Sequence, residues 1–276
     1  MSLKCPLGLI DAFVSETPFS GNPAGVCLVE EFPETSVMQG VAFEMQWSET
    51  AFLKKIAPDY YHIRWFSPED EAPMCGHATL AASHFLFEKG DVDPDFLRFH
   101  SCAGPLAVHK ETQSGTAWLF LNFPACPIYP CSDEDKKPLA PLLSSLSASM
   151  FYRDALLYVA VLESEDAVAR YRPDFEGIKT LPCRALVLTA RADKGRTYDF
   201  VSRYFAPRVG ITEDPVCGSA HCRLTPFWAR ILHKKNLYAR QLSRRDGLLK
   251  VTYQPGAERV ILGGQARTIL RGTLDL

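Results

Sequence analysis

The stretch Arg64-Trp65-Phe66-Ser67-Pro68, followed shortly by Pro73-Met74-Cys75-Gly76-His77-Ala78, decides the fold because the chain repeats it. The second copy reads Arg203-Tyr204-Phe205-Ala206-Pro207 and then Pro215-Val216-Cys217-Gly218-Ser219-Ala220. Both copies have arginine, an aromatic residue, phenylalanine, a small residue and proline, and then the pattern Pro, apolar, Cys, Gly, any residue, Ala. The two cysteines are separated by about half of the 276 residues. The repeat therefore predicts two similar domains that face each other across one site, with one thiol from each.

Hydrophobic periodicity predicts that each half contains many strands and one buried helix. The helices after the two Cys-Gly pairs are expected at residues 77–88 and 219–233, and Pro226 is expected to bend the second. A further helix is expected at residues 35–46. Residues 19–25 are expected to form a turn-rich loop, because Gly-Asn-Pro breaks regular structure. Strands are expected at residues 9–14, 26–29, 50–54, 61–66, 97–99, 106–109 and 117–123, and again at 156–162, 185–189, 198–205, 238–243, 248–254, 259–262 and 267–274.

Five prolines in residues 124–141 indicate a connection between the two domains, followed by a short helix at residues 142–149. We expect an N-terminal domain at residues 1–123 and a C-terminal domain at residues 124–264. The chain length suits two domains of roughly 100–150 residues each.

The formal net charge of −2 argues against a protein that binds nucleic acid or a membrane surface, because such proteins usually carry a basic excess. Residues 1–6 contain no apolar segment of signal-peptide length, and the longest apolar run, residues 155–162, is too short to span a bilayer. We therefore expect a soluble, cytoplasmic protein. Nine cysteines, an odd number, indicate free thiols rather than a disulfide framework.

Each Cys-Gly pair lies between a predicted strand and a predicted helix. The first N–H groups of a helix have no acceptor within it, so this end attracts anions such as a substrate carboxylate. The same positive end is expected to lower the pKa of the thiols of Cys75 and Cys217. Two thiols beside one carboxylate could remove a proton from the neighbouring carbon and return it on the opposite face. The pattern predicts racemisation or epimerisation without a cofactor.

Two other interpretations of these residues stay open. Both cysteines can be packing residues beside a glycine turn, since buried cysteine is often inert. A metal site built from Cys75, His77, Cys217, His221 and Cys222 is disfavoured, because the sequence has no CxxC or HxxxH pair, and we predict no metal.

With these residues in view, the sequence resembles the PhzF family of phenazine biosynthesis-like proteins. The resemblance covers essentially the whole chain. It is most specific in Asp11-Ala12-Phe13 with Phe19-Ser20-Gly21-Asn22-Pro23-Ala24, Ser48-Glu49-Thr50-Ala51-Phe52, Cys75-Gly76-His77-Ala78-Thr79 and Glu213-Asp214-Pro215-Val216-Cys217-Gly218-Ser219-Ala220-His221. The resemblance implies the diaminopimelate epimerase-like α+β fold, with two pseudo-symmetric domains, each a mixed-sheet barrel around a central helix. It also implies that a C-terminal strand, about residues 265–276, returns to the first domain.

The resemblance also implies roles for single residues. The catalytic glutamate of the family falls on Glu49, the general acid and base of an isomerisation. Further catalytic positions are Cys75, Cys217 and Asp214. The phenazine enzyme lacks the cysteine pair, so this chain combines the carboxylate of one branch with the thiols of the other. Substrate-binding positions are Asn22, Gly76, His77, Gly218, Ser219 and Ala220, the last standing where the epimerases have glycine.

The function predicted from residues and resemblance together is a cofactor-independent isomerase or epimerase. It would act by proton abstraction and return on a small carboxylic acid bound between the two domains. The mammalian relatives bear the name MAWD-binding protein, which implies the alternative of a regulatory module that binds a WD-repeat protein. A third interpretation is a redox sensor that uses Cys75 and Cys217. Relatives are often homodimers, so a homodimer is expected.

Overall fold

The structure is a computed structural model that describes residues 4–90, 92–93, 95–113, 115–144, 146 and 148–276. Backbone contacts divide the chain into two compact units. Unit 1 is Met1–Asn122 together with Leu262–Leu276, and unit 2 is Phe123–Ile261. The end of the chain therefore packs with its beginning. The expectation about a signal peptide concerns residues 1–6, of which residues 1–3 lie outside the described part.

Unit 1 is built from a mixed β-sheet and two helices. Its elements are β1 (Lys4–Ala12), β2 (Asn22–Val29), α1 (Thr35–Met45), β3 (Glu49–Ala57), β4 (Tyr60–Phe66), β5 (Glu71–Ala72), α2 (Gly76–Lys89), β6 (Phe96–Ser101), β7 (Gly104–Gln113), β8 (Thr116–Pro124) and β17 (Ala266–Asp275). Strands pair in the order β17–β1–β2–β3–β4–β6–β7–β8. The pairs β2/β3 and β4/β6 are parallel. Because a parallel pair needs a crossover, α1 lies between the strands of the first pair along the chain and α2 between those of the second.

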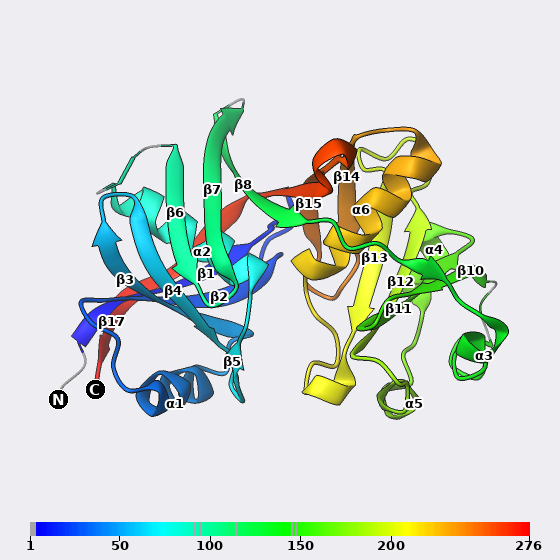
Figure 1. The fold of residues 1–276 in the computed structure, drawn as a ribbon, viewed down its shortest axis with the longest axis horizontal. Helices are drawn as coiled ribbons and strands as arrows, with labels where there is room; N and C mark the ends of the chain where they lie inside the picture. Colours follow the sequence, from blue (N-terminus) through cyan, green and yellow to red (C-terminus); the bar gives the residue numbers. More distant parts are fainter. Residues whose placement is uncertain (1–3, 91, 94, 114, 145, 147) are drawn as a thin grey trace. The chain divides into compact units, whose positions relative to one another are not determined.

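Both faces of this sheet are covered by a helix. Helix α2 is buried from His77 to Leu86 apart from His84, and it packs against β1, β2, β3 and β17 (Figure 1). Helix α1 covers the opposite face, where Met38 and Val41 pack in one cluster with Phe52. A strand with helices on both sides is buried on both sides, which explains why the four residues of β3 after Glu49 are all buried. The packing of α1 and α2 on the sheet thus holds the start of β3 in place near the start of α2.

Unit 2 repeats this arrangement. Its elements are β9 (Tyr129–Pro130), α3 (Asp133–Lys136), β10 (Ala148–Arg153), β11 (Leu157–Leu162), α4 (Glu165–Arg170), α5 (Phe175–Lys179), β12 (Ala185–Arg191), β13 (Phe200–Phe205), the 3₁₀ turn η1 (Pro207–Val209), α6 (Gly218–Leu232), β14 (Asn236–Gln241), β15 (Gly247–Gln254), the 3₁₀ turn η2 (Pro255–Ala257) and β16 (Arg259–Gly264). Strands pair in the order β9–β10–β11–β12–β13–β14–β15. The pairs β11/β12 and β13/β14 are parallel, as are β2/β3 and β4/β6 in unit 1. Helices again occupy the two crossovers, with α4 and α5 in the first and α6 in the second.

Helix α6 continues through Pro226. Proline has no N–H group, so the carbonyl four residues earlier, that of Cys222, loses its helical partner. The N–H of Cys126 donates to this carbonyl at 3.0 Å. The proline-rich segment 124–141 therefore satisfies the helix at the point where Pro226 interrupts its hydrogen bonds.

Segment 124–141 is more than a connection. Cys131 and Leu139 are buried in the core of unit 2. The segment also contains α3, whose start carries a capping box: the Ser132 hydroxyl accepts from the N–H of Asp135, and the Asp135 carboxylate accepts from the N–H of Ser132. The sequence shows this capping box as Ser132 followed three residues later by Asp135.

Two other local predictions were wrong. The helix expected at residues 142–149 is absent from the described part of that range, which excludes residues 145 and 147; a turn ends there and β10 begins at Ala148. The loop expected at residues 19–25 ends earlier, because β2 begins at Asn22. Gly21 makes this entry possible: its φ is +85°, and a Cβ there would lie 2.6 Å from the carbonyl oxygen of Ala12.

Among the described residues, no helix is both long enough and apolar enough to cross a membrane.

Candidate active site

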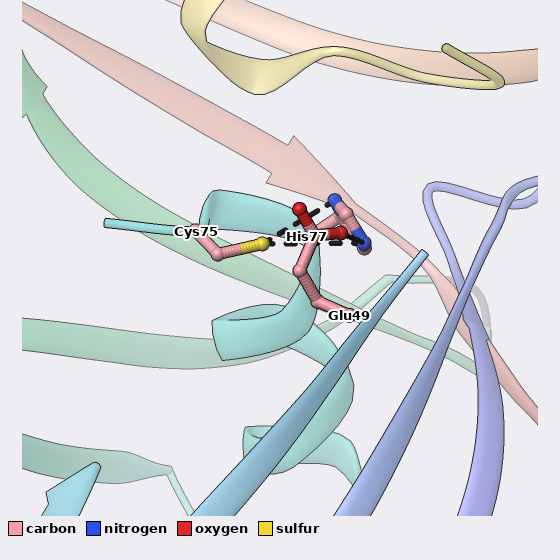
Figure 2. A group of neighbouring side chains, drawn as sticks. All are labelled: Glu49, Cys75 and His77. Carbon is pink, nitrogen blue, oxygen red and sulfur yellow. Dashed lines mark hydrogen bonds and ion pairs between the residues drawn. The ribbon is translucent and has the colours of Figure 1, made fainter. Parts of the chain in front are cut away.

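A cluster of three ionisable side chains lies at the start of α2 in unit 1. Glu49 is the first residue of β3, Cys75 immediately precedes α2, and His77 is its second residue. Oε2 of Glu49 lies 3.0 Å from Nε2 of His77, and Sγ of Cys75 lies 3.5 Å from Nδ1 of the same ring. Figure 2 shows the sulfur and the carboxylate meeting the imidazole. The three side chains are mostly buried, and the structure brings these three predicted site residues together.

Asn22 extends this cluster from the neighbouring strand. The parallel register of β2 and β3 pairs Ala24 with Glu49, so the start of β2 lies beside the start of β3. Nδ2 of Asn22 lies 3.3 Å from Nδ1 of His77, and the hydroxyl of Ser48 donates to Oδ1 of Asn22 at 2.9 Å. Asn22 is one of the predicted substrate-binding residues, whereas Ser48 was not predicted to belong to the site.

The corresponding start of α6 in unit 2 is arranged similarly around Cys217. Its sulfur lies 3.3 Å from Oγ of Ser219, the residue equivalent to His77 in the repeat. The N–H of Cys217 donates to Oε1 of Gln241 at 3.0 Å, and Nε2 of Gln241 donates to the carbonyl of Asp214 at 2.6 Å. Gln241 is fully buried on β14 and fixes the loop that carries both predicted residues. Nothing in the sequence pointed to Gln241, because the contact joins residues on separate elements.

The first turn of each helix is closed by the residue four positions after the cysteine. Oγ1 of Thr79 donates to the carbonyl of Cys75 at 2.6 Å, and Nδ1 of His221 meets the carbonyl of Cys217 at 2.7 Å. Since a carbonyl can only accept, His221 carries its proton on Nδ1. Burial lowers the pKa of His221 to about 4, so the ring is neutral at pH 7.

The repeated arginines hold the segments that lead to the two helices. Nε and Nη2 of Arg64 donate to the two carboxylate oxygens of Glu71, each at 2.7 Å. Nε and Nη2 of Arg203 donate in the same way to Glu213, at 2.7 and 3.1 Å. Each glutamate lies four residues before the cysteine of its copy. The repeat thus includes a bidentate ion pair between arginine and glutamate in each copy.

The expected lowering of the thiol pKa is wrong for both cysteines. Burial, followed by the charge of Glu49, raises the pKa of Cys75. Burial, followed by the charge of Asp214, raises the pKa of Cys217 well above its ordinary value. His77 and Ser219 act in the opposite direction but do not outweigh these effects. Desolvation and a neighbouring carboxylate both disfavour a thiolate, and together they exceed the lowering effect of the backbone N–H groups of Ala78 and Ala220 at the two helix starts.

The environment of His77 combines opposing effects on its pKa. Burial by itself lowers the pKa, whereas Cys75 and Glu49 raise it, and the net result lies well above the ordinary value. We attribute this to Glu49, whose carboxylate contacts Nε2, because the thiol of Cys75 stays protonated at neutral pH. The ring and the carboxylate therefore hold a proton between them.

We expect Cys75 and Cys217 to react with iodoacetamide with rate profiles that reach half-maximum at a higher pH than an ordinary thiol, because the thiolate reacts and both pKa values are raised. The rates are measured by mass spectrometry of the two peptides as a function of pH. Glu49→Gln should move the profile of Cys75 to lower pH, since it removes a raising charge, and leave that of Cys217 in place. A Cys75 profile that does not move in this variant would contradict the assignment.

Glu49, Cys75 and His77 are also the described side chains close enough together to surround a metal ion, with their ligand atoms within 4.8 Å of one another. These atoms already contact each other directly, with Glu49 bound to His77. Of the other residues considered for a metal, His221 uses Nδ1 on a carbonyl and Cys222 is buried in α6. We assign no metal to the cluster.

The remaining predicted substrate-binding residues lie in the first turns of α2 and α6, as expected from the sequence. Gly76 and Gly218 are the first residues of α2 and α6, and Ser219 and Ala220 follow in the first turn of α6. In unit 1 the structure brings together Asn22, Glu49, Cys75, Gly76 and His77; in unit 2 it brings together Asp214, Cys217, Gly218, Ser219 and Ala220.

Comparison with known proteins places the chain in a family. Residues 10–272 match the PhzC-PhzF family, described as phenazine biosynthesis-like protein. An uncharacterized isomerase of Pseudomonas aeruginosa is 40% identical, over 97% of this chain and 97% of that protein. The crystal structure of a PhzF family protein from Enterococcus faecalis is similar with a TM-score of 0.90 at 37% identity, over 99% of this chain and 100% of that one.

A hydroxyproline epimerase from Agrobacterium vitis shares the fold, with a TM-score of 0.63 at 12% identity over 99% of this chain and 93% of that one. The predicted epimerase-like α+β fold is therefore confirmed, as is the resemblance to the PhzF family. The chain belongs to the PhzC-PhzF family of phenazine biosynthesis-like proteins, and it is an isomerase of that family.

Proposed function

We propose that this isomerase removes a proton from the carbon next to a carboxylate and returns it, with Glu49 as acid and base and without a cofactor. The observation that carries the proposal is the contact of 3.0 Å between Oε2 of Glu49 and Nε2 of His77. A carboxylate held by an imidazole at a mostly buried position is oriented and can exchange a proton with a bound substrate.

The start of α2 supports a carboxylic acid as the substrate class. The first N–H groups of α2, from Gly76 onward, have no acceptors within the helix. They carry the positive end of a helix of 14 residues, which favours an anion. Removing the proton places further negative charge on the substrate carboxylate, so the same groups stabilise the transition state more than the bound substrate.

The cysteines receive a different role from the one their sequence pattern suggested. With raised pKa values, Cys75 and Cys217 are neutral at pH 7 and can donate a proton or a hydrogen bond, but they are poor bases. We therefore assign the abstraction step to Glu49. That one substrate uses both Cys75 and Cys217 is a prediction from the sequence repeat.

The proposal is tested by hydrogen exchange between substrate and solvent. The protein is incubated with pools of amino acids and hydroxy acids in deuterium oxide, and the recovered acids are analysed by mass spectrometry. Incorporation of one deuteron at the carbon beside the carboxylate supports the proposal. No incorporation into any acid of the pools counts against it.

Chelation should leave the activity unchanged. If Glu49 and His77 move the proton without a cofactor, incubation with EDTA followed by desalting should change the rate of deuterium incorporation by less than about twofold, since no Lewis acid is removed. The rate before and after treatment is the measurement. A large loss that is restored by adding one divalent metal ion would show that the activity needs a metal.

The expected homodimer, the WD-repeat partner and the cytoplasmic location remain predictions from the family resemblance and the sequence.

A further inference from the structure

We propose that Ser48 is a positioning residue of this site: acting through Asn22, it places on Nε2, facing Glu49, the one proton that the His77 imidazole carries in its uncharged form. The inference rests on the proposed function for its purpose, since it explains how Glu49 is oriented. The contacts that carry it lie within unit 1 and involve no substrate.

The first step is the orientation of the Asn22 amide. The Ser48 hydroxyl donates to Oδ1 of Asn22 at 2.9 Å, so the carbonyl side of the amide is turned toward Ser48. The NH₂ side is then turned toward Nδ1 of His77, at 3.3 Å. Asn22 is fully buried, so its orientation is decided by protein partners rather than by bulk water.

The second step is the position of the proton on His77. An NH₂ group can only donate, so in the uncharged ring Nδ1 of His77 accepts from Asn22. A neutral imidazole that accepts at Nδ1 carries its proton on Nε2. Nε2 lies 3.0 Å from Oε2 of Glu49, so the Nε2–H group donates to that oxygen.

Cys75 favours the same form of the ring. Its sulfur lies 3.5 Å from Nδ1 and 4.0 Å from Nε2, so the S–H group is better placed to donate to Nδ1. Glu49 on β3 and Cys75 at the start of α2 are the titratable groups that act on His77 among the described residues. The lone pair of Nδ1 thus accepts from the Asn22 amide, with the Cys75 thiol beside it, and the carboxylate of Glu49 accepts at Nε2.

The consequence for the reaction is an oriented base. With Oε2 of Glu49 occupied by the Nε2–H group, Oε1 is the oxygen left to take the substrate proton. The proton on Nε2 stays on the ring, and the carboxylate becomes a carboxylic acid only when Oε1 binds the substrate proton. Ser48 therefore influences the reaction without touching the substrate.

The test is a nitrogen NMR measurement of the histidine rings in the full chain. Long-range ¹H–¹⁵N spectra of protein labelled with ¹⁵N-histidine distinguish a protonated from an unprotonated ring nitrogen, and His77→Gln identifies the signals of His77. At pH values above its titration, His77 should be protonated on Nε2. His221 provides an internal reference of the opposite kind, because its Nδ1 donates to the carbonyl of Cys217.

Three variants separate positioning from general disturbance. Ser48→Ala should shift the ratio of the two neutral forms of His77 by about fivefold toward protonation on Nδ1, the equivalent of one net hydrogen bond. Ser48→Thr keeps the hydroxyl and should restore the ratio of the unchanged protein. Ser67→Ala, which removes another half-buried hydroxyl of unit 1 that accepts from the N–H of Asp70, should leave His77 unchanged.

The inference is overturned if His77 of the unchanged protein carries its proton on Nδ1, or if it remains doubly protonated at the highest pH at which the protein stays folded. It is also overturned if Ser48→Ala leaves the ratio unchanged. The first two results are measured on the unchanged protein, so the inference can be tested even if the Ser48→Ala protein folds poorly. Because the spectrum requires no substrate, failure of deuterium exchange would remove the proposed function and leave this result intact.

Discussion

Replacing Glu49 by glutamine is expected to reduce the rate of proton exchange by about 10²- to 10⁴-fold, the usual contribution of a general acid and base. Glutamine has the shape of glutamate and its side-chain oxygen can still accept from Nε2 of His77, which lies 3.0 Å from Oε2 in the unchanged protein. It cannot take a proton from carbon. The turnover rate should therefore fall while the Michaelis constant changes little.

The measurement is the rate of deuterium incorporation into the best substrate found in the exchange experiment, over a range of substrate concentrations. Glu44→Gln is the matched control, because Glu44 is an exposed glutamate on α1 of the same unit and should be neutral. If Glu49→Gln keeps more than about a tenth of the rate, Glu49 is not the base, since loss of a general base costs more than this.

Comparison with His77→Gln separates the base from its partner. Glutamine at this position removes the imidazole that meets Glu49 and Cys75 but leaves the carboxylate in place. A positioning partner should cost less than the base, so the rate is expected to fall less than in Glu49→Gln. The reverse order would assign the abstraction step to His77.

The duplicated motif was sufficient to predict where the buried helix of each unit begins. Cys75 and Cys217 were each expected immediately before a buried helix, and each is the residue before α2 or α6. The motif predicts these helix starts because its arginine, aromatic residues and cysteine lie on one strand, the loop after it and the start of the next helix. These three elements follow one another along the chain, so a short stretch of sequence is enough to recognise them.

What the sequence did not reveal depends on contacts between distant segments. The raised pKa values of the thiols come from burial and from Glu49 or Asp214, and no local pattern reports how deeply a side chain is buried. The roles of Ser48 and Gln241 likewise arise from hydrogen bonds across 26 and 24 positions of the chain. The short helices α4 and α5 were not predicted because only one or two residues of each are buried, which is too few for a helical pattern of apolar residues.

Replacing Arg203 by methionine is expected to destabilise the protein by about 3–5 kcal/mol, the cost of leaving a buried charge without its partner. Nε and Nη2 of Arg203 bind Glu213, and Nη1 donates to the carbonyl of Tyr171 at 2.8 Å. The Arg203 side chain is only 10% exposed and that of Glu213 only 19%. Methionine fills a similar length but leaves the carboxylate and the carbonyl without a donor. The loss is measured as the free energy of unfolding in urea.

The other copy of the motif supplies the control for this effect. Arg64 makes the same bidentate pair with Glu71, but the two side chains are 22% and 34% exposed, so water can replace the lost partner. Arg64→Met should therefore cost only about 1 kcal/mol, near the upper end of values for exposed pairs. Adding Glu213→Gln to Arg203→Met should recover part of the loss, because it removes the uncompensated charge. Equal losses at Arg64 and Arg203 would mean that the shared motif, and not the depth of burial, sets the contribution of the pair.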